Sequence, residues 1–212
     1  MRPQGRFVTL EGIEGAGKST VARSVSEWLR SRGQSVRLTR EPGGTPLAER
    51  LREIVLQRGE EGVSATSETL LMFAGRSLHL ENLIRPALAA GEWVICDRFT
   101  DATRAYQGSG RGVDAGWIEQ LALAVHGGLA PDRTVLLDVP VAVGLARARE
   151  RKGAAAADRF EVEGEAFFER VRAGYLELAR REPGRFRVID AQATVNEVER
   201  QVQAILAPLL AA

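Results

Sequence analysis

The sequence predicts an α/β fold in which helices cover both faces of a parallel sheet. Two observations predict it: short runs rich in Val, Leu and Ile recur along the chain, and amphipathic stretches with helical spacing separate them. A third is the glycine-rich segment GIEGAGKS, which directly follows the first apolar run. Because open parallel sheets bind ligands beyond the carboxyl ends of their strands, functional residues are expected just after the apolar runs.

The expected strands are five apolar runs: Arg6–Leu10, Ser35–Thr39, Glu92–Cys96, Arg133–Leu137 and Phe186–Ile189. The intervening helices carry apolar residues at spacings of three, four and seven, which place them on one helical face. Three such sets are Val21, Val25, Trp28 and Leu29; Leu47, Leu51, Ile54 and Val55; and Phe167, Val171, Tyr175 and Leu178. No repeat or linker divides the chain, so one domain over residues 1–212 is expected.

The composition excludes several classes of protein. Hydrophobic residues make up 44% of the chain and charged residues 27%, and 29 basic residues nearly balance 28 acidic ones. No overall positive field therefore points to nucleic acid or a membrane surface as a partner. The single cysteine, Cys96, cannot form an internal disulfide, and no apolar segment is typical of a membrane span or a secretory signal. A cytoplasmic protein is expected.

The segment Gly12–Ser19 fits the pattern GxxxxGK[ST] of a phosphate-binding loop, the P-loop. Glycines let backbone N–H groups surround phosphate oxygens at the start of a helix. Lys18, one of only two lysines, is expected to reach the β- and γ-phosphates, and the Ser19 hydroxyl to bind Mg²⁺. The residues expected to bind ATP here are Gly12, Ile13, Glu14, Gly15, Ala16, Gly17, Lys18, Ser19 and Thr20.

A P-loop alone is compatible with kinases, GTPase switches and ATPases. The chain contains neither an NKxD guanine-binding motif nor an LSGGQ transporter signature. Its small size favours a small-molecule kinase. A regulatory P-loop ATPase, which would report nucleotide binding to a partner, stays open as an alternative.

Two further motifs follow predicted strands and suit a second anionic ligand. Arg40 begins the segment REPGGT, whose proline and glycines indicate a tight loop. The third strand ends in Asp97-Arg98, where Asp97 is placed to lie near Mg²⁺ and Arg98 to hold a phosphate by two hydrogen bonds.

Taken together, GIEGAGKST, TREPGGT, DRF, AYQGSGRG and the late DRFE resemble the bacterial thymidylate kinase (dTMP kinase) family, in this order and from about Phe7 to Ala191. The resemblance implies a P-loop nucleoside monophosphate kinase fold, with a five-stranded parallel sheet and a mobile lid at about residues 147–162. It also implies a homodimer and the reaction ATP + dTMP → ADP + dTDP with Mg²⁺. A kinase of another nucleoside monophosphate is the nearer alternative.

The resemblance also assigns roles to residues. Lys18, Arg98, Arg151 and Glu14 are the implied catalytic residues, and Ser19 and Asp97 the implied metal ligands. The implied substrate-binding residues are Glu14, Arg40, Glu41, Pro42, Met72, Phe73, Arg76, Arg98, Thr103, Tyr106 and Gln107.

In this family, a catalytic arginine comes either from the P-loop or from the lid. Gly15 stands where the first arrangement has a basic residue, so the second arrangement is expected. The candidates are Arg147, Arg149, Arg151 and Arg159, around the flexible segment Gly153–Ala157. Arg151 is expected to be catalytic, and the other three to bind ATP.

Two departures from the family pattern concern recognition of the base. Relatives carry a phenylalanine four residues before Arg76, where this chain has Met72, with Phe73 next to it. Either Met72 contacts thymine or a local shift of the helix lets Phe73 stack on it. Ala102-Thr103 replaces a pair of hydroxyl residues, so one hydroxyl is missing.

Overall fold

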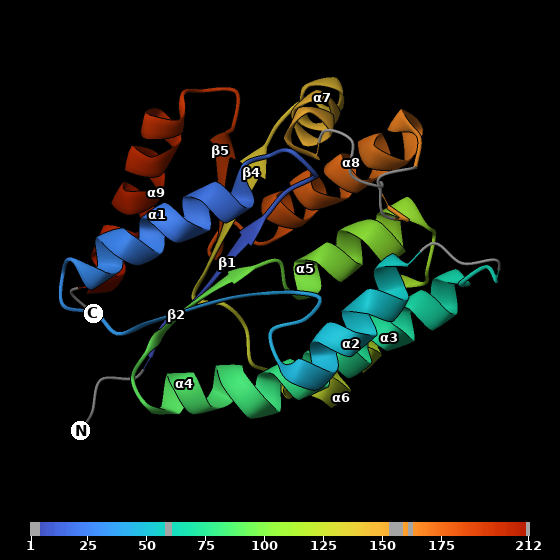
Figure 1. Ribbon diagram of the computed structural model, residues 1–212, viewed down its shortest axis with the longest axis horizontal. Coiled ribbons are helices and arrows are strands. Elements are labelled where there is room, and N and C mark those ends of the chain that lie inside the picture. Colours follow the sequence, from blue (N-terminus) through green and yellow to red (C-terminus); the bar gives the residue numbers. More distant parts are fainter. Residues whose placement is uncertain (1–4, 58–60, 153–158, 161–162, 211–212) are drawn as a thin grey trace.

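In the computed structural model the chain forms a five-stranded, wholly parallel sheet with β1 at its centre (Figure 1). The structure describes residues 5–57, 61–152, 159–160 and 163–210. The strand order is β2-β3-β1-β4-β5. The strands are β1 (Phe7–Glu11), β2 (Val36–Arg40), β3 (Trp93–Asp97), β4 (Arg133–Asp138) and β5 (Phe186–Asp190). The expected fold class and the five strands are confirmed.

The strands extend further toward their carboxyl ends than the apolar runs do. Asp97 pairs with Leu10 on one side and with Arg40 on the other, so the last residue pairs of these strands include polar residues. Backbone pairing does not depend on side-chain polarity, whereas the sequence pattern ends at the last apolar residue. The polar residues Glu11, Arg40 and Asp97 are therefore strand residues, held rigidly at one edge of the sheet.

Helices cover both faces of the sheet. Helices α1 (Lys18–Arg30) and α9 (Val195–Leu210) contact each other on one face of the sheet. Helices α3, α4 and α6 lie on the opposite face (Figure 1). The remaining helices are α2 (Pro46–Leu56), α3 (Ala65–His79), α4 (Arg85–Ala89), α5 (Thr100–Thr103), α6 (Ala115–His126), α7 (Val141–Lys152) and α8 (Glu165–Arg181). Two π-helical turns, η1 (Leu80–Ile84) and η2 (Arg104–Gly110), continue α3 and α5.

Alternate residues of β1 pack on opposite faces of the sheet, as the pleat of a strand requires. Val8 and Leu10 belong to a cluster that includes Val21 and Val25 of α1. Phe7 belongs to a second cluster, with Val94, Cys96 and residues of η1 and α4. Both faces are buried, so β1 and the P-loop that follows it are fixed at the centre of the molecule.

Helix α8 lies very close to η2, the turn that carries the AYQGSGRG motif. A Cβ atom at Gly110 would lie 2.6 Å from the Phe167 ring, and one at Gly174 would lie 2.3 Å from the Ser109 hydroxyl. The predicted apolar face of α8 is confirmed, since Phe167, Val171 and Tyr175 are buried. This contact places Tyr175 beside the motif.

The helix predicted from Leu47, Leu51, Ile54 and Val55 is present as α2, but its apolar face is only partly buried. Val55 is buried, but Leu47 and Ile54 are 48% and 52% exposed. Leu70 on α3 and Leu123 on α6 are also exposed, by 47% and 70%. Because α2 contacts α3 and α3 contacts α6, these apolar side chains lie on three neighbouring helices. In the described part of the chain, no helix is both long and apolar enough to cross a membrane.

Candidate active site

A cavity of about 420 Å³ opens at the carboxyl edge of the sheet, where β1 and β3 end. It brings together most of the residues that the sequence predicted for donor, metal and acceptor binding. The predicted residues that line it are Glu14, Gly15, Gly17, Lys18, Ser19, Arg40, Glu41, Pro42, Met72, Arg76, Asp97, Arg98, Thr103, Tyr106, Gln107 and Arg151. Five more lining residues were not predicted to bind a ligand: Arg52, Leu56, Phe99, Ala102 and Phe160.

The P-loop forms one wall of the cavity. The Lys18 ammonium group donates hydrogen bonds to the carbonyl oxygens of Gly12 and Ile13, at 2.9 and 2.8 Å. Burial, and then the positive charge of Arg98, lower the pKa of Lys18 to about 8. An anion that enters the cavity beside Lys18 would therefore stabilise the charged form of its ammonium group. Ile13 and Ala16 are buried in the core and hold the loop in place, and Thr20 lies in the first turn of α1.

Ser19 and Asp97 meet at the end of the P-loop. The Ser19 hydroxyl donates a hydrogen bond to Oδ2 of Asp97 at 2.7 Å. Both side chains line the cavity and present oxygen atoms, which are the ligands that Mg²⁺ prefers. Within the described residues, no cluster of three or more His, Cys, Asp or Glu side chains could enclose a metal ion. A hydroxyl and one carboxylate fit an ion that keeps water and substrate phosphates as its other ligands.

Arg98 reaches across the centre of the cavity. Its Nη2 donates hydrogen bonds to Oε1 of Glu14 at 2.9 Å and to the Tyr106 hydroxyl at 3.0 Å. The Tyr106 hydroxyl in turn donates to Oε2 of Glu14 at 2.6 Å. Burial raises the pKa of Tyr106 well above its usual value, so this group is a neutral donor. The three residues form one hydrogen-bonded unit between the P-loop and η2.

Arg76 lies deeper in the cavity and is nearly inaccessible to water. Its Nε donates to Glu41 at 2.8 Å, and its Nη2 donates to the Thr103 hydroxyl at 3.0 Å. Its Nη1 is buried and has no hydrogen-bond partner among the residues that the structure describes. A buried donor without a hydrogen-bond partner costs free energy. An anionic oxygen in the cavity would accept the hydrogen bond that Nη1 of Arg76 can donate.

Glu41 is held on its other side by His79. Nδ1 of His79 lies 3.1 Å from Oε1 of Glu41, and its Nε2 lies 2.7 Å from the Thr39 hydroxyl. Burial acts in the opposite direction, but Arg76 and His79 together keep the pKa of Glu41 below its usual range. His79 thus has a packing role in a buried network.

The structure distinguishes the two candidates for the base contact. Met72 lines the cavity, whereas Phe73 packs with Ile118 and Ala122 of α6 in a separate cluster. The structure therefore does not bring Phe73 into the cavity. Helix α3 keeps its register through this point, and adjacent residues of a helix point about 100° apart.

The lid arginines have different surroundings. Arg151 at the end of α7 lines the cavity. Arg149 is exposed, and Nη1 of Arg147 donates to the carbonyl oxygen of Ala191 at 2.8 Å. A Cβ atom at Gly15 would lie 1.9 Å from the carbonyl oxygen of Gly144 in α7, so the P-loop has no room for a side chain there. The predicted flexible segment Gly153–Ala157 lies outside the described residues.

Arg159, predicted to bind ATP, lies away from the cavity in this structure. Its guanidinium group is bound to Glu68 and to the carbonyl oxygens of Val55 and Val63, and it does not line the cavity. Glu68, fully buried on α3, also accepts hydrogen bonds from Gln107 and Arg111. Sequence reasoning missed this acidic centre because Glu68 resembles an ordinary acidic residue in the first turn of a helix. Arg159 thus binds a carboxylate of α3.

Comparisons with known proteins show the family to which the chain is similar. The family model for thymidylate kinase matches residues 10–202. The chain is 54% identical over 206 residues to a thymidylate kinase of Pseudomonas syringae pv. syringae, which covers 97% of both chains. It is 53% identical to one from Teredinibacter turnerae, over 97% of this chain and 99% of the relative.

The fold is also similar to a solved structure. The crystal structure of thymidylate kinase from Ehrlichia chaffeensis matches 96% of this chain and 99% of its own, with a TM-score of 0.78 and 34% sequence identity. By sequence and by fold, this chain belongs to the thymidylate kinase family.

Proposed function

We propose that this chain carries out the reaction of its family by placing two phosphate-bearing substrates on either side of Arg98. The terminal phosphoryl group of ATP is transferred to dTMP, giving ADP and dTDP. The observation that supports this arrangement is the shared cavity, which holds Lys18 and Ser19 on one wall and Arg76 with its unpartnered Nη1 on another. A regulatory ATPase has no use for this second cationic pocket.

The donor site is assigned to the P-loop. The backbone N–H groups of residues 12–19 and the Lys18 ammonium group would hold the β- and γ-phosphates of ATP, at the start of α1. Ser19 and Asp97 would hold Mg²⁺, which supplies positive charge that bridges phosphate oxygens when it is bound. Arg147 and Arg149 of α7 remain candidates for binding ATP.

The acceptor site is assigned to the opposite wall. Arg76 and Arg98 would hold the phosphate of dTMP, with the Arg40–Pro42 segment beside it. Met72 would provide an apolar contact for the thymine ring, and Thr103, Tyr106 and Gln107 would line the nucleoside. Glu14 lies between the two sites and fixes Arg98 and Tyr106 relative to the P-loop.

Phosphoryl transfer in this site needs no strong general base, because the attacking group is already a phosphate oxyanion. The protein contributes positioning and positive charge. Lys18 and Arg98 are in place without ligand, and Arg151 would approach the transferred group from α7. Closure of a lid over residues 147–162 would exclude water, which otherwise competes as acceptor.

One experiment separates the candidate functions. The purified protein is incubated with Mg²⁺ and ATP together with dTMP, dUMP, dCMP, dAMP, dGMP or TMP with a ribose sugar, and ADP formation is measured. The proposal expects dTMP to be the best substrate, with dUMP used detectably. Activity on a purine nucleotide instead would assign another kinase, and hydrolysis of ATP independent of any acceptor would indicate a regulatory ATPase.

The exposed apolar side chains support a homodimer. Leu47 and Ile54 of α2, Leu70 of α3 and Leu123 of α6 would be buried against a second copy of the chain. Sedimentation should give a dimer for the natural protein and a monomer for Leu123→Glu. Val195→Glu, which changes a side chain of similar exposure on α9, is the matched control and should leave the dimer intact.

A further inference from the structure

Arg98 adopts an unusual backbone conformation. Its φ of +72° is the one positive φ among the described residues that are not glycine. Such a conformation costs free energy and persists only where the surrounding structure holds it. The N–H group of Arg98 donates to the carbonyl oxygen of Leu10 at 2.9 Å, which ties this turn to the end of β1.

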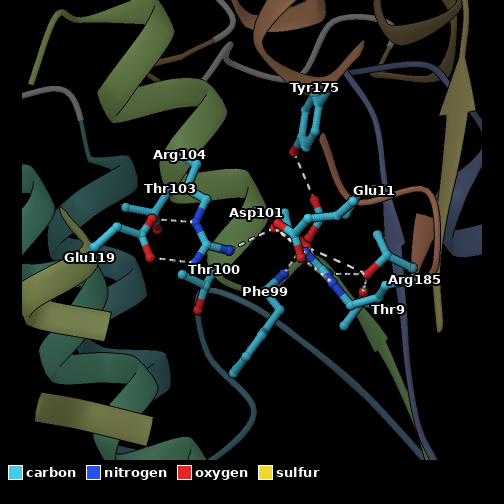
Figure 2. A network of polar contacts seen from close by, with 12 residues as sticks. Thr9, Glu11, Phe99, Thr100, Asp101, Thr103, Arg104, Glu119, Tyr175 and Arg185 are labelled. Carbon is cyan, nitrogen blue, oxygen red and sulfur yellow. Dashed lines mark hydrogen bonds and ion pairs between the residues drawn. The ribbon is translucent and has the colours of Figure 1, made fainter. Parts of the chain in front are cut away.

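The residue after Leu10 holds the other side of the same turn. Glu11 is fully buried at the carboxyl end of β1, and its Oε1 accepts a hydrogen bond from the N–H group of Phe99 at 2.7 Å. The turn at Arg98 is therefore fixed before and after its strained residue. Figure 2 shows the Glu11 carboxyl group pointing toward both Phe99 and Tyr175.

Tyr175 connects the same carboxyl group to the side chain of Arg98. The Tyr175 hydroxyl donates to Oε2 of Glu11 at 2.8 Å and accepts from Nη1 of Arg98 at 3.2 Å. Glu11 thus reaches Arg98 by two routes, through the backbone that follows it and through its guanidinium group. Glu14 and Tyr106, by contrast, bind the other terminal nitrogen, Nη2.

Within the described part of the chain, both hydrogen bonds of the Glu11 carboxyl group serve this turn. A separate ion-pair network lies next to it, where Asp101 accepts from Arg104 and Arg185 (Figure 2). That network joins α5 to the start of β5 and has no hydrogen bond to Glu11. Glu11 is thus not simply one more member of a structural ion-pair cluster.

We propose that Glu11 and Tyr175 are positioning residues that orient Arg98 toward the acceptor phosphate before substrate binds. This inference rests on the proposed phosphate-binding role of Arg98. The Tyr175 hydroxyl holds Nη1 without adding a second carboxylate to that of Glu14, which already binds Nη2. With a tyrosine between them, Glu11 fixes the direction of the guanidinium group from a distance.

The test compares dTMP with thymidine, which lacks the phosphate. Calorimetry gives the dissociation constants of both ligands for the natural protein, Arg98→Ala, Tyr175→Phe, Glu11→Leu and Thr9→Val. Thr9→Val is the matched control: Thr9 lies two residues before Glu11, is equally buried, and bonds to Thr134 and not to the Arg98 turn. Thermal melting of each variant reports whether it is folded.

The proposal expects Tyr175→Phe to lower the preference for dTMP over thymidine by about tenfold, with thymidine affinity unchanged. Glu11→Leu should lower it at least as far, since both routes to Arg98 are lost. Thr9→Val should change the melting temperature alone. If Glu11→Leu does not fold, Tyr175→Phe decides the question by itself.

Three outcomes would overturn the proposal. An unchanged preference in Tyr175→Phe would show that the hydroxyl does not orient Arg98. Equal weakening of dTMP and thymidine would show a general loosening of the site. If Arg98→Ala itself keeps the natural preference, the phosphate-binding role of Arg98 fails first, and the inference fails with it.

Discussion

The Ser19 hydroxyl and the Asp97 carboxylate share a hydrogen bond of 2.7 Å across the carboxyl edge of the sheet. Ser19 belongs to the first turn of α1 and Asp97 is the last residue of β3, so the pair joins two elements 78 positions apart in the sequence. Since β3 pairs directly with β1, the sheet itself sets the distance between the P-loop and Asp97.

This pair should determine the requirement for Mg²⁺. Asp97→Asn keeps the shape of the side chain but removes its charge, so the Mg²⁺ concentration that gives half-maximal activity should rise by about tenfold or more. The measurement is a titration of activity with Mg²⁺ at saturating ATP and dTMP. Asp190→Asn, which changes the last residue of the edge strand β5, is the control. A natural Mg²⁺ dependence in Asp97→Asn would remove Asp97 from the metal site.

Lys18 should contribute to phosphoryl transfer far more than to dTMP binding. Its ammonium group bonds to carbonyl oxygens of the P-loop and lies on the donor side of the cavity. Lys18→Ala should therefore lower kcat by about 10²–10³-fold or more and change the dissociation constant of dTMP only modestly. Steady-state kinetics and equilibrium binding of dTMP check the two halves separately. Near-natural turnover in this variant would contradict the assignment of the donor site.

Met72 should set the preference for thymine over uracil. The two bases differ by one methyl group, which an apolar pocket distinguishes by about 1–3 kcal/mol. Met72→Ala should therefore bring kcat/KM for dTMP and dUMP closer together. Phe73→Leu is the matched control, because Phe73 packs against Ile118 and Ala122 outside the cavity and its loss should affect stability alone. If the two variants discriminate equally well, Met72 does not contact the methyl group.

Glu11 should make the folded protein less stable as the pH rises through neutrality. Burial, and then the nearby carboxylate of Asp101, raise the pKa of Glu11 from 4.5 to about 8. Between these two values the unfolded chain has lost the proton that the folded chain keeps, so the free energy of unfolding decreases with increasing pH. Below pH 4.5 both states are protonated and above pH 8 both are ionised, so this contribution levels off at each end.

Chemical denaturation of Glu11→Gln at pH 5 and pH 8.5 measures this effect. The glutamine stays neutral at both pH values. The free energy of unfolding of the variant minus that of the natural protein should therefore be larger at pH 8.5 than at pH 5. A constant difference in the free energy of unfolding would show that Glu11 titrates in its ordinary range.

Sequence reasoning predicted the sheet and the position of the P-loop because both depend on local patterns. The P-loop needs glycine at fixed positions, and Gly17 indeed has a φ of +92° at the start of α1. The motif residues Arg40 and Asp97 lie at adjacent strand ends, as the parallel sheet requires. Their proximity follows from topology without any knowledge of side-chain contacts.

The parts that sequence reasoning missed depend on contacts between distant segments. Glu11 comes just before the P-loop and resembles an ordinary polar strand end, but Tyr175 reaches it from 164 positions away. Arg159 has the same residue type and region as Arg151, yet the buried carboxylate of Glu68 holds it outside the cavity. No periodicity in the sequence distinguishes two arginines of one segment, since their difference lies in what packs beside them.

Arg151 and Arg149 offer a direct test of the catalytic lid arginine. Both lie on α7 and are exposed, but Arg151 lines the cavity and Arg149 does not. A cation that meets charge on the transferred phosphoryl group is worth about 10³–10⁵-fold in turnover, so Arg151→Ala should lower kcat by about 10³-fold and leave dTMP affinity nearly unchanged. Arg149→Ala, the matched control, should keep a kcat close to that of the natural protein, because a role of Arg149 in binding ATP would change the KM for ATP instead.

Arg159→Ala completes this comparison. Arg159 is bound to Glu68 and to α2–α3 carbonyl groups, so its loss should disturb the attachment of the lid and raise KM more than it lowers kcat. Stopped-flow measurement of a single turnover separates the chemical step from binding for all three variants. If Arg151→Ala raises KM and leaves kcat unchanged, Arg151 only binds ground-state nucleotide. If instead Arg159→Ala loses more kcat than Arg151→Ala, the catalytic cation is Arg159, after a rearrangement that breaks its ion pair with Glu68.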